Sequence, residues 1–281
     1  MGDVFRSTYG EDYPVKDVYR PDVLLKEIEA GRLACTLFLN EDDRPAGYAS
    51  MFRTAPNPRI WEAGNMIVVP EYAGADITQR IVLHYANYIH DLLNRADGIY
   101  GEAVCSHYYT QVTMNKAGMV DCGIEMDQLD GTSFKDGKSN RAGSARVSCV
   151  FNFMEKKGLP EPQYVPARYE RIIGRIAAQL HRRTLSLSRE GLPADGSTLF
   201  EGKYHESART WKVAVYAIGT DWRETVGDIL EKARQQGVIS LQVTLNMACP
   251  HIGAAVDFLR GKRFFFGGLA PRWFGTDGIL M

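Results

Sequence analysis

Residues 62–81, EAGNMIVVPEYAGADITQRI, contain the feature that decides the fold, a strand that leads through a short turn directly into a helix. The apolar stretch 60–69 predicts a long strand that ends at Pro70. Small residues at 72–76 predict the turn, and apolar residues at helical spacing then predict a helix over 77–93. The apolar stripe of this helix consists of Ile77, Ile81, Tyr85, Tyr88, Ile89 and Leu92.

The flanking sequence predicts further alternation of helices and strands. Before the central unit we expect a helix from Pro21 to Gly31, then a hairpin of strands 33–39 and 46–53. After it we expect strand 98–104, a helix over 107–117 that closes at Gly118, and paired strands 119–127 and 146–153.

The second half of the chain predicts a similar series of elements. Residues 158–166, GLPEPQYVP, hold three prolines and predict a linker between a first domain, 1–157, and a second, 167–281. Further strands are expected at 211–218, 239–245, 263–269 and 277–281, with helices from Tyr169, from Trp222 and over 251–260. Three residues, His107, Gly118 and Gly123, recur about 144 positions later as His251, Gly261 and Gly267. We therefore predict that the second half is a diverged, partial copy of the first.

Composition excludes several classes of function. The 281 residues include 33 Lys and Arg against 34 Asp and Glu, so the chain lacks the basic footprint of a nucleic-acid-binding protein. No apolar run is long enough to span a membrane, and no signal peptide is visible. The five cysteines form no C-x-x-C pair, a pattern typical of free thiols in a reducing compartment. We expect a cytoplasmic protein without a metal site.

The order helix, hairpin, long strand, turn, helix, strand, helix and strand pair resembles that of the GNAT (general-control-related N-acetyltransferase) superfamily. The residues that carry the resemblance are 62–81 and EAVCSHYYTQVTMNKAGMVDCG, 102–123. Val68, Pro70 and Tyr72 match the V-x-P-x-Y that precedes the family's glycine-rich turn. The resemblance implies an α/β (α+β) fold with a GNAT-like mixed twisted sheet flanked by helices and a second diverged, partial half. Strands 60–69 and 98–104 should be adjacent, parallel and separated at their C-terminal ends.

The resemblance also implies acetyl-CoA or another acyl-CoA as cosubstrate, with at most one bound per chain. Backbone amides at a helix N-terminus suit its pyrophosphate, and the preceding strand suits its pantetheine amides. The positions implied are Met66, Ile67 and Val68 on the strand and Ala73, Gly74, Ala75, Asp76, Ile77 and Thr78 in the turn.

Asp76 departs from the family pattern, which has glycine at this position. Its spacing from Gln79 is that of a capping box, so an ordinary helix cap explains it. A carboxylate there would also occupy the amides that hold a pyrophosphate and repel the anion. A cap that weakens CoA binding is therefore a second interpretation, and both can hold.

Four residues are candidates for catalysis. Glu62 lies where many GNAT enzymes place a carboxylate base, and Glu102 and His107 follow at the end of the next predicted strand. The family often has a tyrosine acid where this chain has Met114, so Tyr109 is a substitute by proximity. Three of the candidates also have a structural explanation: an ion pair for Glu62, a local cap for His107 and packing for Tyr109.

The sequence supports two functions. The first is an acyl-CoA-dependent N-acyltransferase in which an amine of a small molecule or protein attacks the thioester directly, with the second half shaping the acceptor cleft. The second is a catalytically inactive GNAT-like protein that binds a metabolite or protein, favoured by the degenerate turn and by Met114. A homodimer is among the expected assemblies, whereas nucleic acid and membrane are not expected partners.

Overall fold

The structure, a computed structural model, describes residues 2–11, 13, 16–72, 80, 83–84, 87–88, 91–92, 94–131 and 146–281. The helices are α1 (Gly2–Tyr9), α2 (Pro21–Glu29), α4 (Tyr109–Lys116), α5 (Glu170–Ala177), α6 (Trp222–Gln235) and α7 (Ile252–Gly261). The strands are β1 (Leu33–Leu39), β2 (Pro45–Phe52), β3 (Ile60–Val68), β4 (Gly98–Val104), β5 (Val120–Asp130), β6 (Arg146–Met154), β7 (Leu159–Pro166), β8 (Arg183–Ser188), β9 (Leu199–His205), β10 (Thr210–Ala217), β11 (Ser240–Asn246), β12 (Gly268–Ala270) and β13 (Gly278–Leu280).

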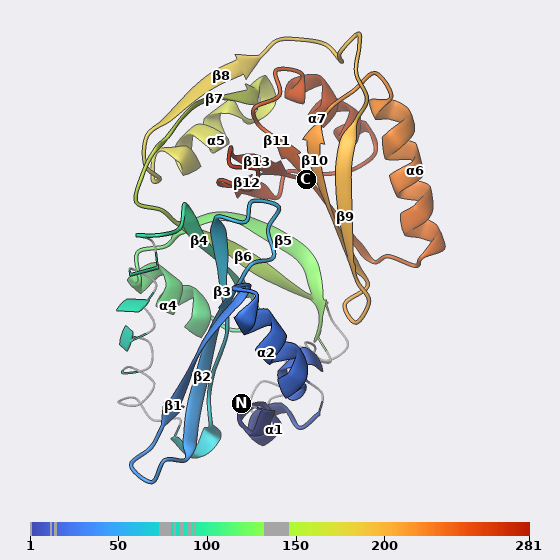
Figure 1. Ribbon diagram of the computed structural model, residues 1–281. Helices are drawn as coiled ribbons and strands as arrows, with labels where there is room; N and C mark the ends of the chain where they lie inside the picture. The colour runs from blue at the N-terminus through green and yellow to red at the C-terminus, as the bar shows by residue number, and fades with distance from the viewer. Residues whose placement is uncertain are drawn as a thin grey trace.

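Within the described ranges, eleven strands form one mixed sheet that runs through both halves of the molecule (Figure 1). Its order is β1-β2-β3-β4-β6-β5-β12-β13-β11-β10-β9. The halves meet where β5 and β12 run antiparallel, with Gly123 opposite Gly268. A Cβ built on Gly268 would lie 2.3 Å from the Cα of Gly123, so the two strands approach this closely because a side chain is absent. The predicted mixed sheet flanked by helices is confirmed.

The parallel strands β3 and β4 form a fork. Their pairing covers residues 60–63 and 98–101, after which the strands separate. On its other side β3 has a bulge, because Tyr48 and Ser50 of β2 pair with Ile67 and Gly64. Asn65 lies in this bulge with a φ of 53°. Since a bulge bends and twists its strand, it turns the end of β3 away from β4. The predicted pair of parallel strands that separate at their C-terminal ends is confirmed.

The two faces of the first half bury different partners. Trp61, Ala63 and Ile99 pack with Met114 of α4 under a helical layer. On the opposite face, the rings of Tyr100 and Phe151 lie 5.4 and 5.9 Å from the ring of Trp273, which belongs to the second half. A hydrophobic core on this face includes residues of both halves. The side chains that alternate with Trp61 and Ile99 therefore face the second half of the chain.

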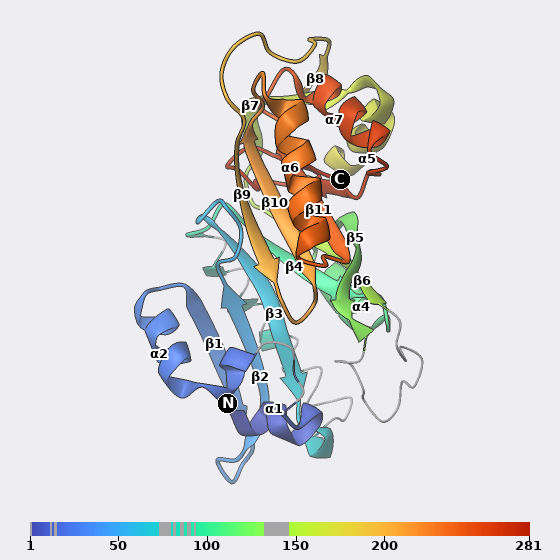
Figure 2. The same cartoon turned by 90° about the vertical axis from the view of Figure 1, so that its right-hand side faces the viewer.

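The second half repeats the strand order of the first. The series β9-β10-β11-β13-β12 corresponds to β2-β3-β4-β6-β5. The directions agree as well: in each series the first pair is antiparallel, the second parallel and the next two antiparallel. The helix α6 connects the parallel strands β10 and β11 and lies against them (Figure 2). This is the second, partial half that the fold class predicts.

Several local expectations differ from the structure. Residues 159–166, predicted as linker, form β7, which pairs in parallel with β8. The prolines are tolerated because a two-stranded sheet consists of edges, where a missing N–H donor costs little. The strands β8 and β9 were not predicted. The helix expected over 77–93 lies largely outside the described residues, although those described between 80 and 92 are helical. In the described part of the chain no helix is long and apolar enough to cross a membrane.

Candidate active site

A carboxylate stands at the point where the fork opens. Glu62 is on β3, in register with Tyr100 on β4, one residue before the paired segment ends. The Tyr100 hydroxyl donates to Glu62 Oε2 at 2.8 Å, and the Thr54 hydroxyl donates to the same oxygen. Two hydroxyl donors on one oxygen fix the direction of the carboxylate, and among the described residues its other oxygen has no hydrogen-bond donor.

The pKa of Glu62 is raised to about 7. Burial is the main cause, since it disfavours the charged form, and the negative charge of Glu102 adds to it. The hydrogen bonds from Thr54 and Tyr100 and the positive charge of Lys212 act in the opposite direction. Glu62 is nevertheless only partly buried. A reachable carboxyl with a pKa near neutrality has the properties of a general base.

A second charged group lies next to Glu62 and includes a lysine from the second half. Lys212 of β10 places its Nζ 2.7 Å from Glu102 Oε1 and 2.9 Å from Glu125 Oε1. Gln128 of β5 donates its side-chain amide to the other oxygen of Glu102. The Lys212 ammonium of the second half thus forms ion pairs with two carboxyl groups of the first half, and the three side chains form one cluster.

The charges in this group follow from its bonds. Burial opposes the charged form of Glu102, but the Lys212 ammonium and the hydrogen bonds from Lys212 and Gln128 outweigh it, so the Glu102 pKa is lowered. For Glu125, burial and the nearby Glu102 charge together raise the pKa to about 8. Burial likewise opposes the charge on Lys212, but Glu102 and Glu125 raise its pKa. At neutral pH the group therefore holds an ionised Glu102, a protonated Glu125 and a charged Lys212.

Several buried polar atoms around Lys212 have no hydrogen-bond partner in the described structure. They are Glu125 Oε2, Gln128 Oε1 and both polar atoms of the Gln242 amide. These three side chains are 4%, 5% and 6% exposed, and Gln242 of β11 is in register with Lys212. A buried polar atom without a partner costs roughly 1–3 kcal/mol. Such a concentration of them is typical of a site that binds polar ligands or water.

The other predicted catalytic residues lie apart from Glu62 and Glu102. His107 and Tyr109 are at the start of α4, with their rings 5.6 Å apart. Tyr109 is 65% exposed, and within the described structure no hydrogen bond or ion pair joins either residue to the two glutamates. Met114, at the position of the family's acid, is buried under Gly101 of β4. The structure thus brings Glu62 and Glu102 together and leaves His107 and Tyr109 at the rim.

The predicted cofactor positions are partly visible. Met66, Ile67 and Val68 lie beyond the bulge, where β3 pairs with β2 through Ile67 and Val68 and has left β4. The open edge of the strand fits the predicted pairing with pantetheine amides. The turn residues Ala73, Gly74, Ala75, Asp76, Ile77 and Thr78 lie outside the described residues. Their role stays a prediction.

Sequence reasoning missed the partners of these glutamates. Tyr100 and Glu102 are two residues apart and therefore lie on the same face of β4. Lys212 is a charged residue within the otherwise apolar strand 211–218, and this was the signal that the sequence offered. The alternation of side chains along a strand, taken alone, would predict that Lys212 lies on the solvent-exposed face of the sheet. The residues that sequence reasoning did not single out are Thr54, Tyr100, Glu125, Gln128, Lys212 and Gln242.

The second half has no open fork. The strands β10 and β11 stay paired from Thr210 and Ser240 as far as Val215 and Leu245. In the turn before α6, the amide of Gly219 donates to Thr198 Oγ1 and that of Thr220 to the Gly196 carbonyl, each at 3.0 Å. The chain's own loop therefore occupies the amides that a phosphate would need.

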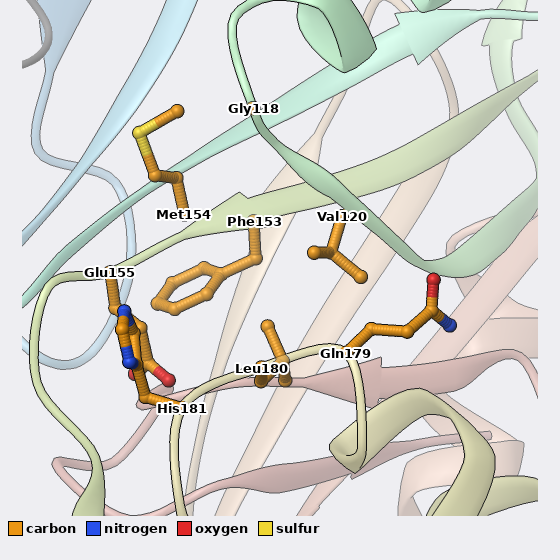
Figure 3. Close-up of a pocket in the computed structure, with 8 residues that line it drawn as sticks. All are labelled: Gly118, Val120, Phe153, Met154, Glu155, Gln179, Leu180 and His181. Carbon is orange, nitrogen blue, oxygen red and sulfur yellow. The ribbon is translucent and has the colours of Figure 1, made fainter.

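A separate cavity of about 190 Å³ opens between β5, β6 and the segment after α5 (Figure 3). The side chains of Val120, Phe153 and Leu180 converge on it, with Glu155 at one side. The Glu155 carboxylate already pairs with Arg183 and Arg272. The lining of this cavity is mixed, and its one carboxylate, that of Glu155, is neutralised by two arginines, so it offers no free base comparable to Glu62.

Two adjacent parallel strands that separate toward their C-terminal ends are the arrangement that the resemblance predicted, and Glu62 lies where they separate. The chain has a GNAT-like fold. Among solved structures it is similar to a protein from Desulfovibrio desulfuricans assigned to the GNAT family of acetyltransferases, with 18% identity, 55% of this chain and 89% of that chain covered, and a TM-score of 0.39.

Two further similar structures are acetyltransferases of known substrate. The spermidine N-acetyltransferase of Vibrio cholerae shows 13% identity over 48% of this chain and 71% of its own, with a TM-score of 0.39. Nourseothricin acetyltransferase shows 14% identity over 44% of this chain and 66% of its own, with a TM-score of 0.33. No protein-family model matches the sequence, and no curated protein does. The likeness is one of fold.

Proposed function

We propose that the chain is an acyl-CoA-dependent N-acyltransferase that transfers an acyl group, with acetyl the simplest case, to an amine of a small molecule or protein. The observation that carries the proposal is Glu62: a reachable carboxyl with a pKa of about 7 at the opening of the fork between β3 and β4. An amine is protonated at neutral pH, and it must lose that proton before its lone pair can attack a carbonyl carbon.

The residues of the fork divide the work of the reaction. Acetyl-CoA would supply the acyl group as an activated thioester. The open edge of β3 at Met66 to Val68 would hold its pantetheine amides, and residues 73–78 its pyrophosphate. Glu62 takes a proton from the incoming ammonium, while Tyr100 and Thr54 keep the carboxylate aimed at it. The nitrogen–carbon bond would then form as the carbon–sulfur bond breaks, and the sulfur would leave with the electron pair. The second proton lost by the nitrogen would pass to that sulfur, so that the products are an amide and a free thiol.

A second candidate function is a catalytically inactive GNAT-like protein that binds a metabolite or protein. Two features favour it. Asp76 replaces a glycine of the phosphate turn in the family pattern, and Met114, a buried side chain that cannot donate a proton, occupies the position of the acid. Under this reading the group around Glu62 and Lys212 would bind a polar ligand without chemistry.

Calorimetric titration with acetyl-CoA and longer acyl-CoAs, followed by thiol release with a panel of amines, decides between the two. We expect saturable binding and turnover, and a loss of about 10²- to 10⁴-fold in kcat for Glu62→Gln. The matched control is Glu231→Gln, which alters an exposed glutamate on α6. Binding of acyl-CoA without turnover of any amine would favour the inactive protein. Absence of binding would refute the acyltransferase.

The division into domains 1–157 and 167–281, which β7 now connects, is part of the same proposal. Because the two parts share one sheet and one hydrophobic core, we expect them to unfold in a single transition, and limited proteolysis that releases either part intact would contradict this expectation. Cytoplasmic location and a homodimer stay predictions, which localisation of a tagged chain and analytical ultracentrifugation can check.

A further inference from the structure

Lys212 occupies the position in the second half that Glu62 occupies in the first. The correspondence follows from strand register, which places Gly268, and not the Gly267 expected from sequence spacing, opposite Gly123 at the junction. Each glycine pairs with the next strand of its own half, Gly123 with Phe151 and Gly268 with Leu280. These partners pair in turn with Glu102 and Thr244. Two residues back along those strands, Tyr100 pairs with Glu62 and Gln242 pairs with Lys212.

The correspondence shows what the second half has lost and what it retains. A lysine stands in place of the carboxylate, and the amide of Gln242 stands in place of the Tyr100 hydroxyl. The strands of the second half also stay closed, so Lys212 has no fork of its own to serve. Its ammonium instead reaches the carboxylates of Glu102 on β4 and Glu125 on β5, at 2.7 and 2.9 Å.

We propose that Lys212 is a positioning residue of the first half's site: it holds Glu102 and Glu125 in one bonded group beside Glu62, so that both halves together form a single site. The proposal rests on the proposed function, which makes Glu62 the base. Three of its observations are geometric, namely the cross-half contacts, the equivalence of Lys212 with Glu62, and the unpartnered atoms of Gln242, Gln128 and Glu125 that surround the contact.

The groups that face Glu62 determine how it responds when Lys212 is changed. Its titratable neighbours are Tyr13 from the segment after α1, Tyr100 and Glu102 on β4, and Lys212 on β10. Further out, Glu125 on β5, Cys149 on β6 and His205 on β9 face Lys212 and Glu102. The half-buried His205 has its pKa lowered to about 4 by desolvation and by the charge of Lys212, and is neutral at physiological pH.

Removal of Lys212 and removal of Glu102 should shift the pKa of Glu62 in opposite directions. In Lys212→Met, Glu102 and Glu125 share one proton and retain one negative charge, now without a cation. The pKa of Glu62 should therefore rise, by about one unit. In Glu102→Gln, Glu125 ionises to pair with Lys212, and the negative charge moves away from Glu62. The pKa of Glu62 should then fall by about one unit.

The experiment is a carbon-13 NMR titration of glutamate side-chain carboxyls in the full chain, with Glu62 assigned by its loss in Glu62→Gln. This readout needs neither substrate nor activity. We expect an upward shift in Lys212→Met, recovery in Lys212→Arg, and a downward shift in Glu102→Gln. The control Lys203→Met, an exposed lysine in register with Lys212 on the neighbouring strand, should leave Glu62 unchanged.

The outcomes separate this inference from the function on which it rests. An unchanged Glu62 titration in both Lys212→Met and Glu102→Gln, with reduced thermal stability, would show that the group is structural and would overturn the proposal. If Lys212→Met does not fold, Glu102→Gln decides, because a downward shift is required. The expected shifts in a protein without turnover would overturn the acyltransferase and leave the coupling of the two halves standing. If amines are turned over, the acidic limb of kcat/KM should move with the NMR values.

Discussion

The raised pKa of Glu62 predicts how the activity depends on pH. A base must be ionised to accept a proton, so activity should be lost as pH falls through the pKa of about 7. The ionised fraction of such a group is about 9% at pH 6 and about 91% at pH 8, so kcat/KM should rise about tenfold between these values. A carboxyl with its ordinary pKa, near 4.5, would be almost fully ionised throughout and would give a flat profile.

The assay is thiol release at limiting amine and saturating acetyl-CoA, measured between pH 5.5 and about 9. The ammonium group of the substrate also titrates in part of this range. Two amines of different basicity separate the contributions, because a limb that belongs to Glu62 stays in place while a substrate limb moves with the amine. In Glu62→Gln, the residual activity should lose the limb near pH 7. The variant Glu231→Gln, altered on an exposed face of α6, should keep it.

Two results would refute this reasoning. A profile that is flat between pH 6 and 8 for both amines would show that Glu62 is not the base or is not raised in pKa. If Glu62→Gln still shows the rise of kcat/KM with pH near 7, this titration belongs to another group. His107, at the mouth of α4, would then be the next residue to replace.

Three further predictions concern stability and cofactor binding. Arg183→Met should lower the free energy of unfolding by about 3–5 kcal/mol in urea denaturation, because it leaves two buried carboxylates short of a partner. The control Arg234→Met, at an exposed arginine, should leave the urea midpoint nearly unchanged, and equal effects of the two variants would contradict the role of the buried network. Gly268→Ala should lower the melting temperature by several degrees, because the added Cβ has no room between β12 and β5. The control Gly261→Ala adds a Cβ in open space and should not lower it. Similar melting temperatures for the two variants would mean that the strands at the junction move apart to accept the side chain. Asp76→Gly should tighten CoA binding about tenfold in calorimetry by removing a repelling carboxylate, and unchanged affinity would mean that the turn does not hold the pyrophosphate.

The elements that sequence reasoning located well are those with a strong local signal. The strand 60–69, the helix from Pro21 and the helix from Trp222 each combine a clear apolar period with a start or stop residue, and all three are present. The segment 159–166 was interpreted as linker because its prolines are poor strand formers. Its pairing with β8 depends on residues more than twenty positions away, and such long-range pairing leaves little trace in local sequence.

The candidate site shows the same division. Glu62 could be named because the resemblance places a carboxylate base at its position, and Glu102 because it lies near the end of the next predicted strand, which pairs with β3. Lys212 could not, because its contact with Glu102 spans 110 positions and crosses from one half to the other. His107 and Tyr109 were nominated by nearness in sequence to the end of β4, and the structure leaves them at the rim.

The sequence by itself determined the GNAT-like order of strands and helices and the presence of a second, partial half, since hydrophobic period and turn residues act over short distances. Tertiary structure decided what those elements do to one another. The bulge at Asn65 opens the first fork, and the loop at Thr198 occupies the turn before α6 in the second half. The fold brings Lys212 of β10 to Glu102 of β4. Burial and neighbouring charges of both signs then set the pKa of Glu62, and both depend on which groups folding brings within a few ångströms.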